Sequence, residues 1–208
     1  VAGDDALAAR LRAKADTVTT VIDRLCWWPE RGLYRDRPGG EELSELTNTW
    51  AILSGAADAE KSAMIAEKLG RDESLAKATL YGRFYVFRAM RECGAYEHAE
   101  CLLDHWYNSM KTDITTFPEN PRFKRSYCHG WSAAPLYEFL AEILGIKPAA
   151  PGFEKVHIEP HLWSLTHAEG SMPVPQGEIS VRWERSGDTF SVSAQAPEGV
   201  AMELVLPD

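Results

Sequence analysis

The sequence has little positive charge for its size. It contains 22 Lys and Arg residues against 31 Asp and Glu residues, which gives a formal net charge of −9 at pH 7. A protein that binds duplex nucleic acid neutralises phosphates with a basic face. The charge balance therefore argues against a nucleic-acid partner.

Long apolar runs are also lacking. No stretch approaches the ~20 apolar residues that a helix needs to cross a bilayer. The first residues, VAGDDALAARLRAKAD, do not show the basic and then apolar order of a secretion signal. No membrane partner is predicted, and because the first methionine is Met64 we expect an excerpt of a longer protein.

Cysteines are few and scattered, with no CxxC and no zinc-like spacing; they are Cys26, Cys93, Cys101 and Cys128. This pattern predicts buried free thiols, with a Cys93–Cys101 disulfide across a short turn as the alternative. Free thiols favour a reducing compartment, the cytoplasm. His157 and His161 have an H-x3-H spacing, but on a strand and turn their rings do not share a face, so neither a metal nor another cofactor is predicted.

Apolar residues recur with a helical period from residue 4 to residue 145. Leu11, Val18, Ile22 and Leu25 lie on one face of a long first helix. Further helices are predicted over 46–54, from an N-cap at Asp58 to Gly70, over 80–93, over 96–110, and from an N-cap at Ser132 to Gly145. Short connections between them are typical of antiparallel helical hairpins.

The period changes to two after the segment GIKPAAPGF. Four segments, KVHIEP, GEISVRWE, TFSVSAQ and VAMELVLP, are rich in alternating or β-branched residues, and the turn sequences RSGD and APEG separate them. Ile179, Val181 and Trp183 face one side, and Phe190 and Val192 can pair with them across a hairpin. The predicted class is therefore α+β, with helical hairpins over 1–147 and a small antiparallel β-sandwich domain over 148–208.

One predicted loop, TTFPENPRFKRSYCHGWS, contains several side chains of the types that bind or react with substrates. Glu119 lies between two prolines, whose stiff backbone suits a group that must point one way. His129 and Trp131 come just before a predicted helix, where backbone N–H groups collect polar ligands. A carboxylate, an imidazole and aromatic rings together suit a carbohydrate site. The alternative is that each residue has a structural role only: Glu119 in a solvated turn, His129 as a helix cap and Trp131 in the core.

Several motifs occur in the order found in one enzyme family. TTFPE, RSYCHGWS, the PGF linker and the PVPQG strand entry, together with the upstream RGLYRD and LTNTWAILSG, resemble the C-terminal part of bacterial α-L-rhamnosidases of glycoside hydrolase family 78. The resemblance spans nearly the whole chain. It implies the late part of an (α/α)6 barrel followed by an antiparallel β-domain.

The resemblance also implies roles for residues. Enzymes of the family invert the configuration at the anomeric carbon. They use two carboxylates on opposite faces of the sugar, of which one protonates the leaving oxygen and the other activates water. By motif position Glu119 matches the general base and His129 a histidine that contacts rhamnose. The family's general acid lies in the early barrel, so neither Asp36 nor Asp113 is assigned that role here.

Further expectations concern the pocket and the partners. Trp131, Trp50 and Trp106 are candidates for lining the sugar pocket, with packing between helices as the alternative for Trp50 and Trp106. The expected partner is a rhamnose-containing glycoside or polysaccharide. We also expect self-association through apolar helix faces, such as Leu80/Phe84/Phe87, which missing barrel helices would cover.

Two other functions stay open from the sequence. One is a non-catalytic carbohydrate-binding or structural fragment without a complete acid–base pair. The other is a related (α/α)6-barrel glycosidase with a different sugar specificity, because the family often has an aromatic residue before the base where this chain has Pro118.

Overall fold

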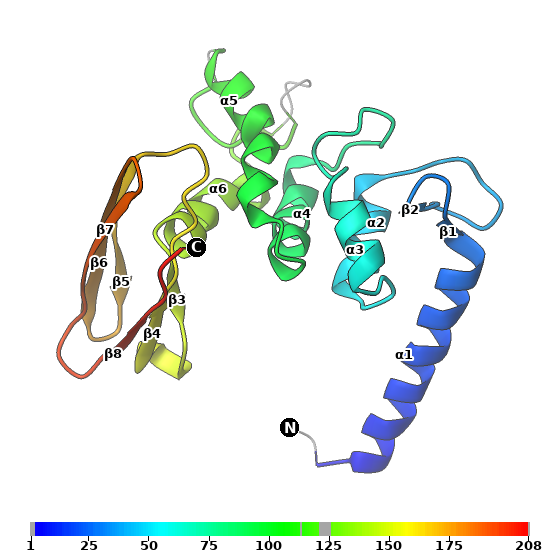
Figure 1. Ribbon diagram of the computed structural model, residues 1–208, viewed down its shortest axis with the longest axis horizontal. Helices are drawn as coiled ribbons and strands as arrows, with labels where there is room; N and C mark the ends of the chain where they lie inside the picture. Colours follow the sequence, from blue (N-terminus) through cyan, green and yellow to red (C-terminus); the bar gives the residue numbers. More distant parts are fainter. Residues whose placement is uncertain (1–2, 113, 121–125, 208) are drawn as a thin grey trace. The chain divides into compact units, whose positions relative to one another are not determined.

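The computed structural model describes residues 3–112, 114–120 and 126–207 of the chain (Figure 1). These residues form two compact units, Val1–Leu102 and Leu103–Asp208. Mixed helices and sheets confirm the α+β class, and the described helices do not close a barrel. Because helices give way to strands near residue 147, we keep the boundary at 147/148 as a proposal for the domain division.

The first unit is helical, as the periodicity predicts. Its elements are α1 (Asp5–Cys26), β1 (Trp27–Trp28), β2 (Leu33–Tyr34), α2 (Glu45–Leu53), α3 (Ala59–Ala66), α4 (Leu80–Glu92) and the 3-10 helix η1 (Tyr96–Leu103). Asp58 caps α3 by accepting the Lys61 amide hydrogen. Gly94, at φ 72°, follows α4 in the left-handed conformation that glycine adopts without strain. Both predicted helix boundaries are confirmed.

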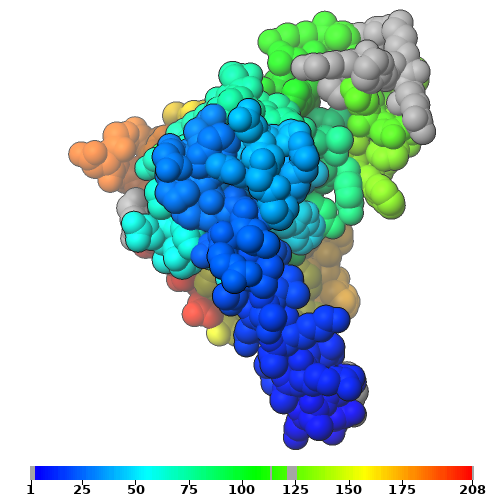
Figure 2. All heavy atoms as spheres, turned by 90° about the vertical axis from the view of Figure 1, so that its right-hand side faces the viewer, coloured from blue at the N-terminus to red at the C-terminus, as the bar shows by residue number. Residues whose placement is uncertain are grey.

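Helix α1 buries none of its residues. It extends away from the other elements of its unit, as Figures 1 and 2 show in blue. Its apolar stripe is exposed to solvent, with Leu11 at 55% and Leu25 at 45% exposure. The expectation that Leu80, Phe84 and Phe87 form the uncovered face is wrong, because Leu80 and Phe87 are buried and Phe84 is half-buried.

Two buried polar side chains tie the first unit together. Glu45 is fully buried at the start of α2, where its carboxylate accepts from the amides of Gly70 and Ala78 and lies 3.5 Å from Lys77 Nζ. Asn48, one turn later, accepts the Tyr34 amide hydrogen at 2.8 Å and donates to the Tyr34 carbonyl at 3.1 Å. Because buried polar groups need partners, these contacts fix β2 and the loop after α3 against α2.

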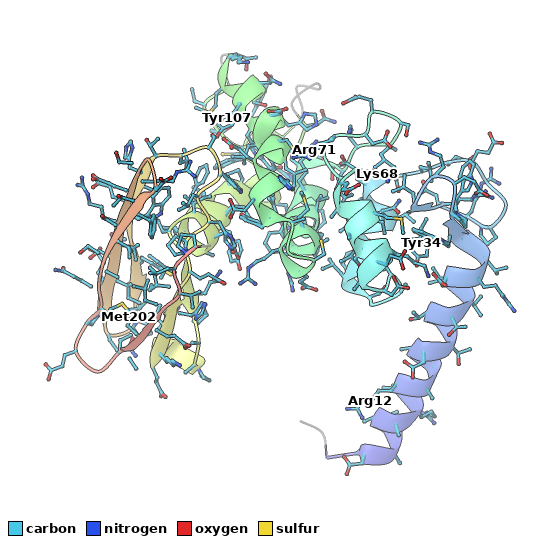
Figure 3. The ribbon with its side chains drawn as sticks, in the orientation of Figure 1. Arg12, Tyr34, Lys68, Arg71, Tyr107 and Met202 are labelled. Carbon is cyan, nitrogen blue, oxygen red and sulfur yellow. The ribbon has the colours of Figure 1, made fainter. Side chains whose placement is uncertain are left out.

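A third polar cluster joins α1, β2 and α3. The Asp23 carboxylate accepts from Tyr34 Oη and from Lys61 Nζ, both at 2.6 Å. Figure 3 shows Tyr34 between α1 and α3. Burial alone would raise the pKa of Asp23, but the hydrogen bonds from Lys61 and Tyr34 lower that pKa below its ordinary value.

The second unit begins with α5 (Asp104–Met110) and then the 3-10 helix η2 (Gly130–Ser132), α6 (Ala134–Tyr137) and the π-helix η3 (Glu138–Ile143). Ser132 is not the predicted N-cap, since the helical turn of η2 precedes α6 and Ala133 takes that position. The Trp106 indole donates to the Ser132 carbonyl at 2.8 Å, which holds this turn against α5. A tertiary contact therefore moves the start of the helix.

Strands follow from residue 146. Their bounds are β3 (Ile146–Pro148), β4 (Lys155–Ile158), β5 (His167–Val174), β6 (Gly177–Ser186), β7 (Thr189–Gln195) and β8 (Ala201–Leu204), with the 3-10 turn η4 (Pro151–Phe153) between β3 and β4. They form two sheets, β3-β4-β8 and β5-β6-β7. All pairs are antiparallel except β4 with β8, which is parallel and departs from the antiparallel expectation.

The β6–β7 hairpin matches the predicted faces. Trp183 lies opposite Val192, and its ring centroid is 6.0 Å from that of Phe190. Ile179, Val181 and Trp183 are buried, and the Trp183 indole donates to the Ile143 carbonyl at 2.8 Å. This side of the sheet therefore packs on η3.

The four cysteines are free thiols, as predicted, and Cys93 and Cys101 form no disulfide. The expectation that they are buried is wrong: Cys128 is exposed, and the other three are half-buried. Cys26 and Cys93 lie at the C-terminal ends of α1 and α4, Cys101 lies within η1, and Cys128 lies in the loop before η2. No helix among the described residues has the length and apolarity to cross a membrane.

Asn48→Ala is predicted to destabilise the chain by about 2–4 kcal/mol, because it leaves the buried Tyr34 amide and carbonyl without partners. The measurement is the free energy of unfolding in urea. Asn108→Ala, at an exposed position of α5, is the control and should change it by less than about 0.5 kcal/mol. Equal effects of the two substitutions would contradict the structural role of Asn48.

Asp23→Asn is predicted to reduce the fall in the free energy of unfolding at acid pH, which is the acid limb of the curve of stability against pH. The folded pKa of Asp23 is lowered, so its contribution is present above the ordinary value of 3.8 and is lost as pH falls below it. Unfolding in urea at a series of pH values checks this, with the exposed Asp16→Asn on the same helix as the control. An acid limb unchanged by Asp23→Asn would refute the linkage.

Candidate functional site

The Glu119 loop is fixed by backbone pairing within the second unit. The His129 amide donates to the Phe117 carbonyl at 2.7 Å, and the Glu119 amide donates to the Ser126 carbonyl at 2.9 Å. The Thr116 hydroxyl donates to the Tyr127 carbonyl. Segment 116–119 therefore lies alongside segment 126–129. This pairing places Glu119 and His129 in the same hydrogen-bonded loop.

Ser126 has an uncommon backbone at this junction. Its φ of 49° lies in the left-handed region, which is costly for residues other than glycine. In this conformation its carbonyl accepts the Glu119 amide hydrogen, and its Oγ lies 3.2 Å from His129 Nδ1. Because that imidazole nitrogen faces a hydroxyl, the Ser126 side chain orients the His129 ring.

His129 and Trp131 flank the start of η2. The two ring centroids are 6.0 Å apart at an interplanar angle of 75°. Trp131 is 68% exposed, so it is not the core residue of the alternative interpretation. His129 occupies the N-cap position of η2, but its side chain makes no capping hydrogen bond. Both rings are thus placed for contacts outside the helical turn.

Glu119 is half-buried, and the preceding Pro118 is buried. Since proline fixes φ and its ring is enclosed, the backbone next to the carboxylate has little freedom. In such an arrangement the carboxylate can accept a proton, the imidazole can hydrogen-bond a hydroxyl, and the exposed indole can stack on an apolar sugar face.

A cavity of about 410 Å³ is lined in part by residues 115–118 of the same loop. Its lining is mainly apolar and includes Trp106, Met110, Phe117, Pro118 and Leu136. Glu119, His129 and Trp131 do not contribute to this lining.

The other tryptophans have different environments. Trp106 is buried, as its packing interpretation predicts, whereas Trp50 on α2 is 48% exposed, so the packing interpretation is wrong for Trp50. Its ring lies 4.9 Å from that of Tyr85 on α4. Trp50 therefore remains a candidate for sugar contact within the first unit.

The sequence analysis did not single out Thr116 or Ser126 as residues that hold Glu119. The Thr-Thr pair before FPE is the only signal for the first, and a serine in a left-handed conformation has no sequence signal of its own. Asp113 lies outside the described residues. Within the described ranges, no group of three or more His, Cys, Asp or Glu side chains is placed to hold a metal ion.

Comparisons with known proteins point to one family. Residues 145–208 match the family described as "Bacterial alpha-L-rhamnosidase C-terminal domain". An alpha-L-rhamnosidase of Alteromonas sp. (strain LOR) is 38% identical over 102 residues, which are 49% of this chain and 11% of that protein.

Solved structures share the fold over most of the chain. The GH78 family rhamnosidase of Bacillus sp. GL1 is 30% identical with a TM-score of 0.84, covering 98% of this chain and 23% of that one. The Streptomyces avermitilis alpha-L-rhamnosidase, solved in complex with L-rhamnose, is 16% identical with a TM-score of 0.66, covering 77% of this chain and 18% of that one. The latter shows the fold alone.

These matches confirm the resemblance to the C-terminal part of family 78 α-L-rhamnosidases. The chain spans about a quarter or less of the length of these relatives, 23% for the Bacillus protein and 11% for the Alteromonas protein.

Thr116→Val is predicted to loosen the Glu119 loop while keeping the shape of the side chain. Loss of one hydrogen bond should speed hydrogen exchange of the His129 amide by up to about tenfold. Amide exchange followed by NMR measures this, and the neighbouring Thr115→Val is the control. Unchanged exchange in Thr116→Val, or equal acceleration in Thr115→Val, would show that the Thr116 hydroxyl does not hold the loop.

Proposed function

We propose that this chain is the base-bearing C-terminal part of an inverting α-L-rhamnosidase, which hydrolyses terminal α-L-rhamnosyl bonds. The observation that carries the proposal is the paired loop, in which Glu119 and His129 are joined by the hydrogen bonds at Phe117 and Ser126. The loop has the motif order of family 78, and the chain is similar to the GH78 rhamnosidase of Bacillus sp. GL1 over 98% of its length.

In the proposed reaction Glu119 is the general base. Its carboxylate takes a proton from a water molecule, and the resulting hydroxide forms a bond to the anomeric carbon as the bond to the leaving oxygen breaks. A second carboxylate, supplied by a part of the protein before this chain, protonates the leaving oxygen. The two carboxylates of an inverting pair lie ~6.5–9.5 Å apart, which leaves room for the water.

His129 and Trp131 are proposed to contact the sugar. The His129 imidazole is oriented by Ser126 and is able to hydrogen-bond a hydroxyl of rhamnose. The exposed indole of Trp131 offers an aromatic face for stacking. The substrate is proposed to be a rhamnose-containing glycoside or polysaccharide, and no cofactor takes part.

Glu119→Gln, in the full-length protein that contains this segment, is predicted to lower kcat by ~10²–10⁴-fold with little change in KM, because the amide keeps the shape but cannot accept the proton. Steady-state hydrolysis of an aryl α-L-rhamnoside measures both constants. Glu198→Gln, at an exposed position, is the control and should leave them unchanged. Near-normal turnover of Glu119→Gln would remove Glu119 from the role of base.

The 208-residue chain by itself is predicted not to hydrolyse a rhamnosyl disaccharide, because the acid that protonates a poor leaving group is proposed to lie elsewhere. It is also predicted to self-associate through the exposed apolar stripe of α1. Product analysis and size-exclusion chromatography with light scattering test the two statements. Turnover of the disaccharide by a monomer would show that both carboxylates are in this chain.

A further inference from the structure

The first unit contains a cavity that the proposed reaction does not use. Its volume is about 360 Å³, within the range of small-molecule sites. Trp50 lines it from α2, Arg35 and Asp36 from the segment after β2, and Ile22 from α1. The lining thus combines an indole, an aliphatic side chain, a guanidinium and a carboxylate.

Trp50 is held in place by other aromatic side chains. Its ring lies 4.9 Å from that of Tyr85, and the Tyr85 ring lies 5.6 Å from that of Tyr81. The two tyrosine hydroxyls are 3.0 Å apart and hydrogen-bonded. Trp50 nevertheless keeps 48% of its surface exposed. A large aromatic ring that is fixed by its neighbours and still accessible loses little entropy when a ligand stacks on it.

The Arg35 side chain is held by an aromatic ring and not by an ion pair with a described residue. Its guanidinium lies 4.0 Å from the centroid of the Trp28 ring, which sets its orientation. Arg35 Nε is buried and has no hydrogen-bond partner, and no described residue accepts a hydrogen bond from the rest of the guanidinium. Such a group has donors left for a ligand.

Asp36 complements it as an acceptor. Its Oδ1 accepts from the Ser44 hydroxyl at 2.7 Å, and no described residue donates to its other carboxylate oxygen. Within the described part of the chain, no ion pair joins Asp36 to Arg35, although they are neighbours in sequence. The cavity therefore presents donors and an acceptor side by side, with no net charge from this pair.

We propose that this cavity is a glycosyl-binding subsite, in which a pyranose ring stacks on Trp50 and its hydroxyls hydrogen-bond to Arg35 and Asp36. A vicinal pair of hydroxyls both donates and accepts, which matches a carboxylate next to a guanidinium. The carboxylate disfavours an anionic ligand such as a phosphate, and the charged pair disfavours a purely apolar one. A neutral polyhydroxylated ring satisfies all three kinds of group.

The choice of L-rhamnose as the sugar rests on the proposed function. Rhamnose carries a methyl group in place of a hydroxymethyl group, and the aliphatic wall of the cavity at Ile22 and Leu46 suits that methyl group. In this subsite Asp36 is a binding residue and not the missing general acid.

The test is ¹⁹F NMR of the 208-residue chain labelled with 5-fluorotryptophan, which gives one resonance for each of its seven tryptophans. Trp50→Phe and Trp131→Phe assign the two resonances of interest. Titration with methyl α-L-rhamnoside is expected to shift the Trp50 resonance saturably, with a millimolar Kd. Asp36→Asn keeps an acceptor for Ser44 but removes the charge, and should raise that Kd about tenfold.

Asp16→Asn, on an exposed position of α1, is the matched control and should leave the Kd unchanged. A Trp50 resonance that does not move, or a Kd that is the same in Asp36→Asn and the unsubstituted chain, overturns the subsite. The Trp131 resonance reports separately on the candidate catalytic loop. If it shifts while that of Trp50 does not, the subsite fails and the proposed function stands; the opposite result supports the subsite and counts against the loop.

Discussion

The hydrogen bond from the His129 amide to the Phe117 carbonyl, 2.7 Å long, is the contact on which the candidate site depends. It aligns two segments so that the Glu119 amide reaches Ser126 and the Ser126 hydroxyl reaches the His129 ring. A base and a sugar-contacting imidazole need a fixed separation, and loop residues supply it only when their backbone is tied down. Here backbone pairing, an enclosed proline and a strained serine together provide that constraint.

The fold supplies a rigid support in each unit. In the second unit, the Trp106 indole anchors η2 to α5, and the Trp183 indole anchors β6 to η3. In the first unit, the buried carboxylate of Glu45 and the amide of Asn48 replace water as partners of loop backbone groups. Tryptophan N–H groups in the second unit and buried polar side chains in the first thus hold neighbouring segments in place.

Local signals in the sequence predicted the local structure well. Asp58 and Gly94 mark helix ends through capping and left-handed glycine, which act within a few residues. Strand β5 was missed because Gly170 and Pro173 reduce its strand character. The observed position of β5 explains both residues. Proline is tolerated at residue 173 because β5 is an edge strand, and glycine is needed at residue 170 because a Cβ there would lie 2.7 Å from Leu144. The start of α6 was misplaced because the Trp106–Ser132 contact is not local.

The candidate site was predictable as a set of residues but not as a geometry. Motif order singled out Glu119 and His129, whereas the pairing that joins them depends on a left-handed Ser126 that no sequence pattern signals. The exposure of Trp50 and the cavity beside Arg35 and Asp36 are likewise outcomes of packing between elements.

The central claim is that Glu119 is the base of an inverting pair. The most direct measurement is a crystal structure of the whole protein with L-rhamnose bound. We expect the Glu119 carboxylate to hold a water on the face of the anomeric carbon opposite the leaving oxygen, with a second carboxylate ~6.5–9.5 Å away. A Glu119 carboxylate remote from the anomeric carbon, or a pair only ~5 Å apart as in retaining enzymes, would contradict the account.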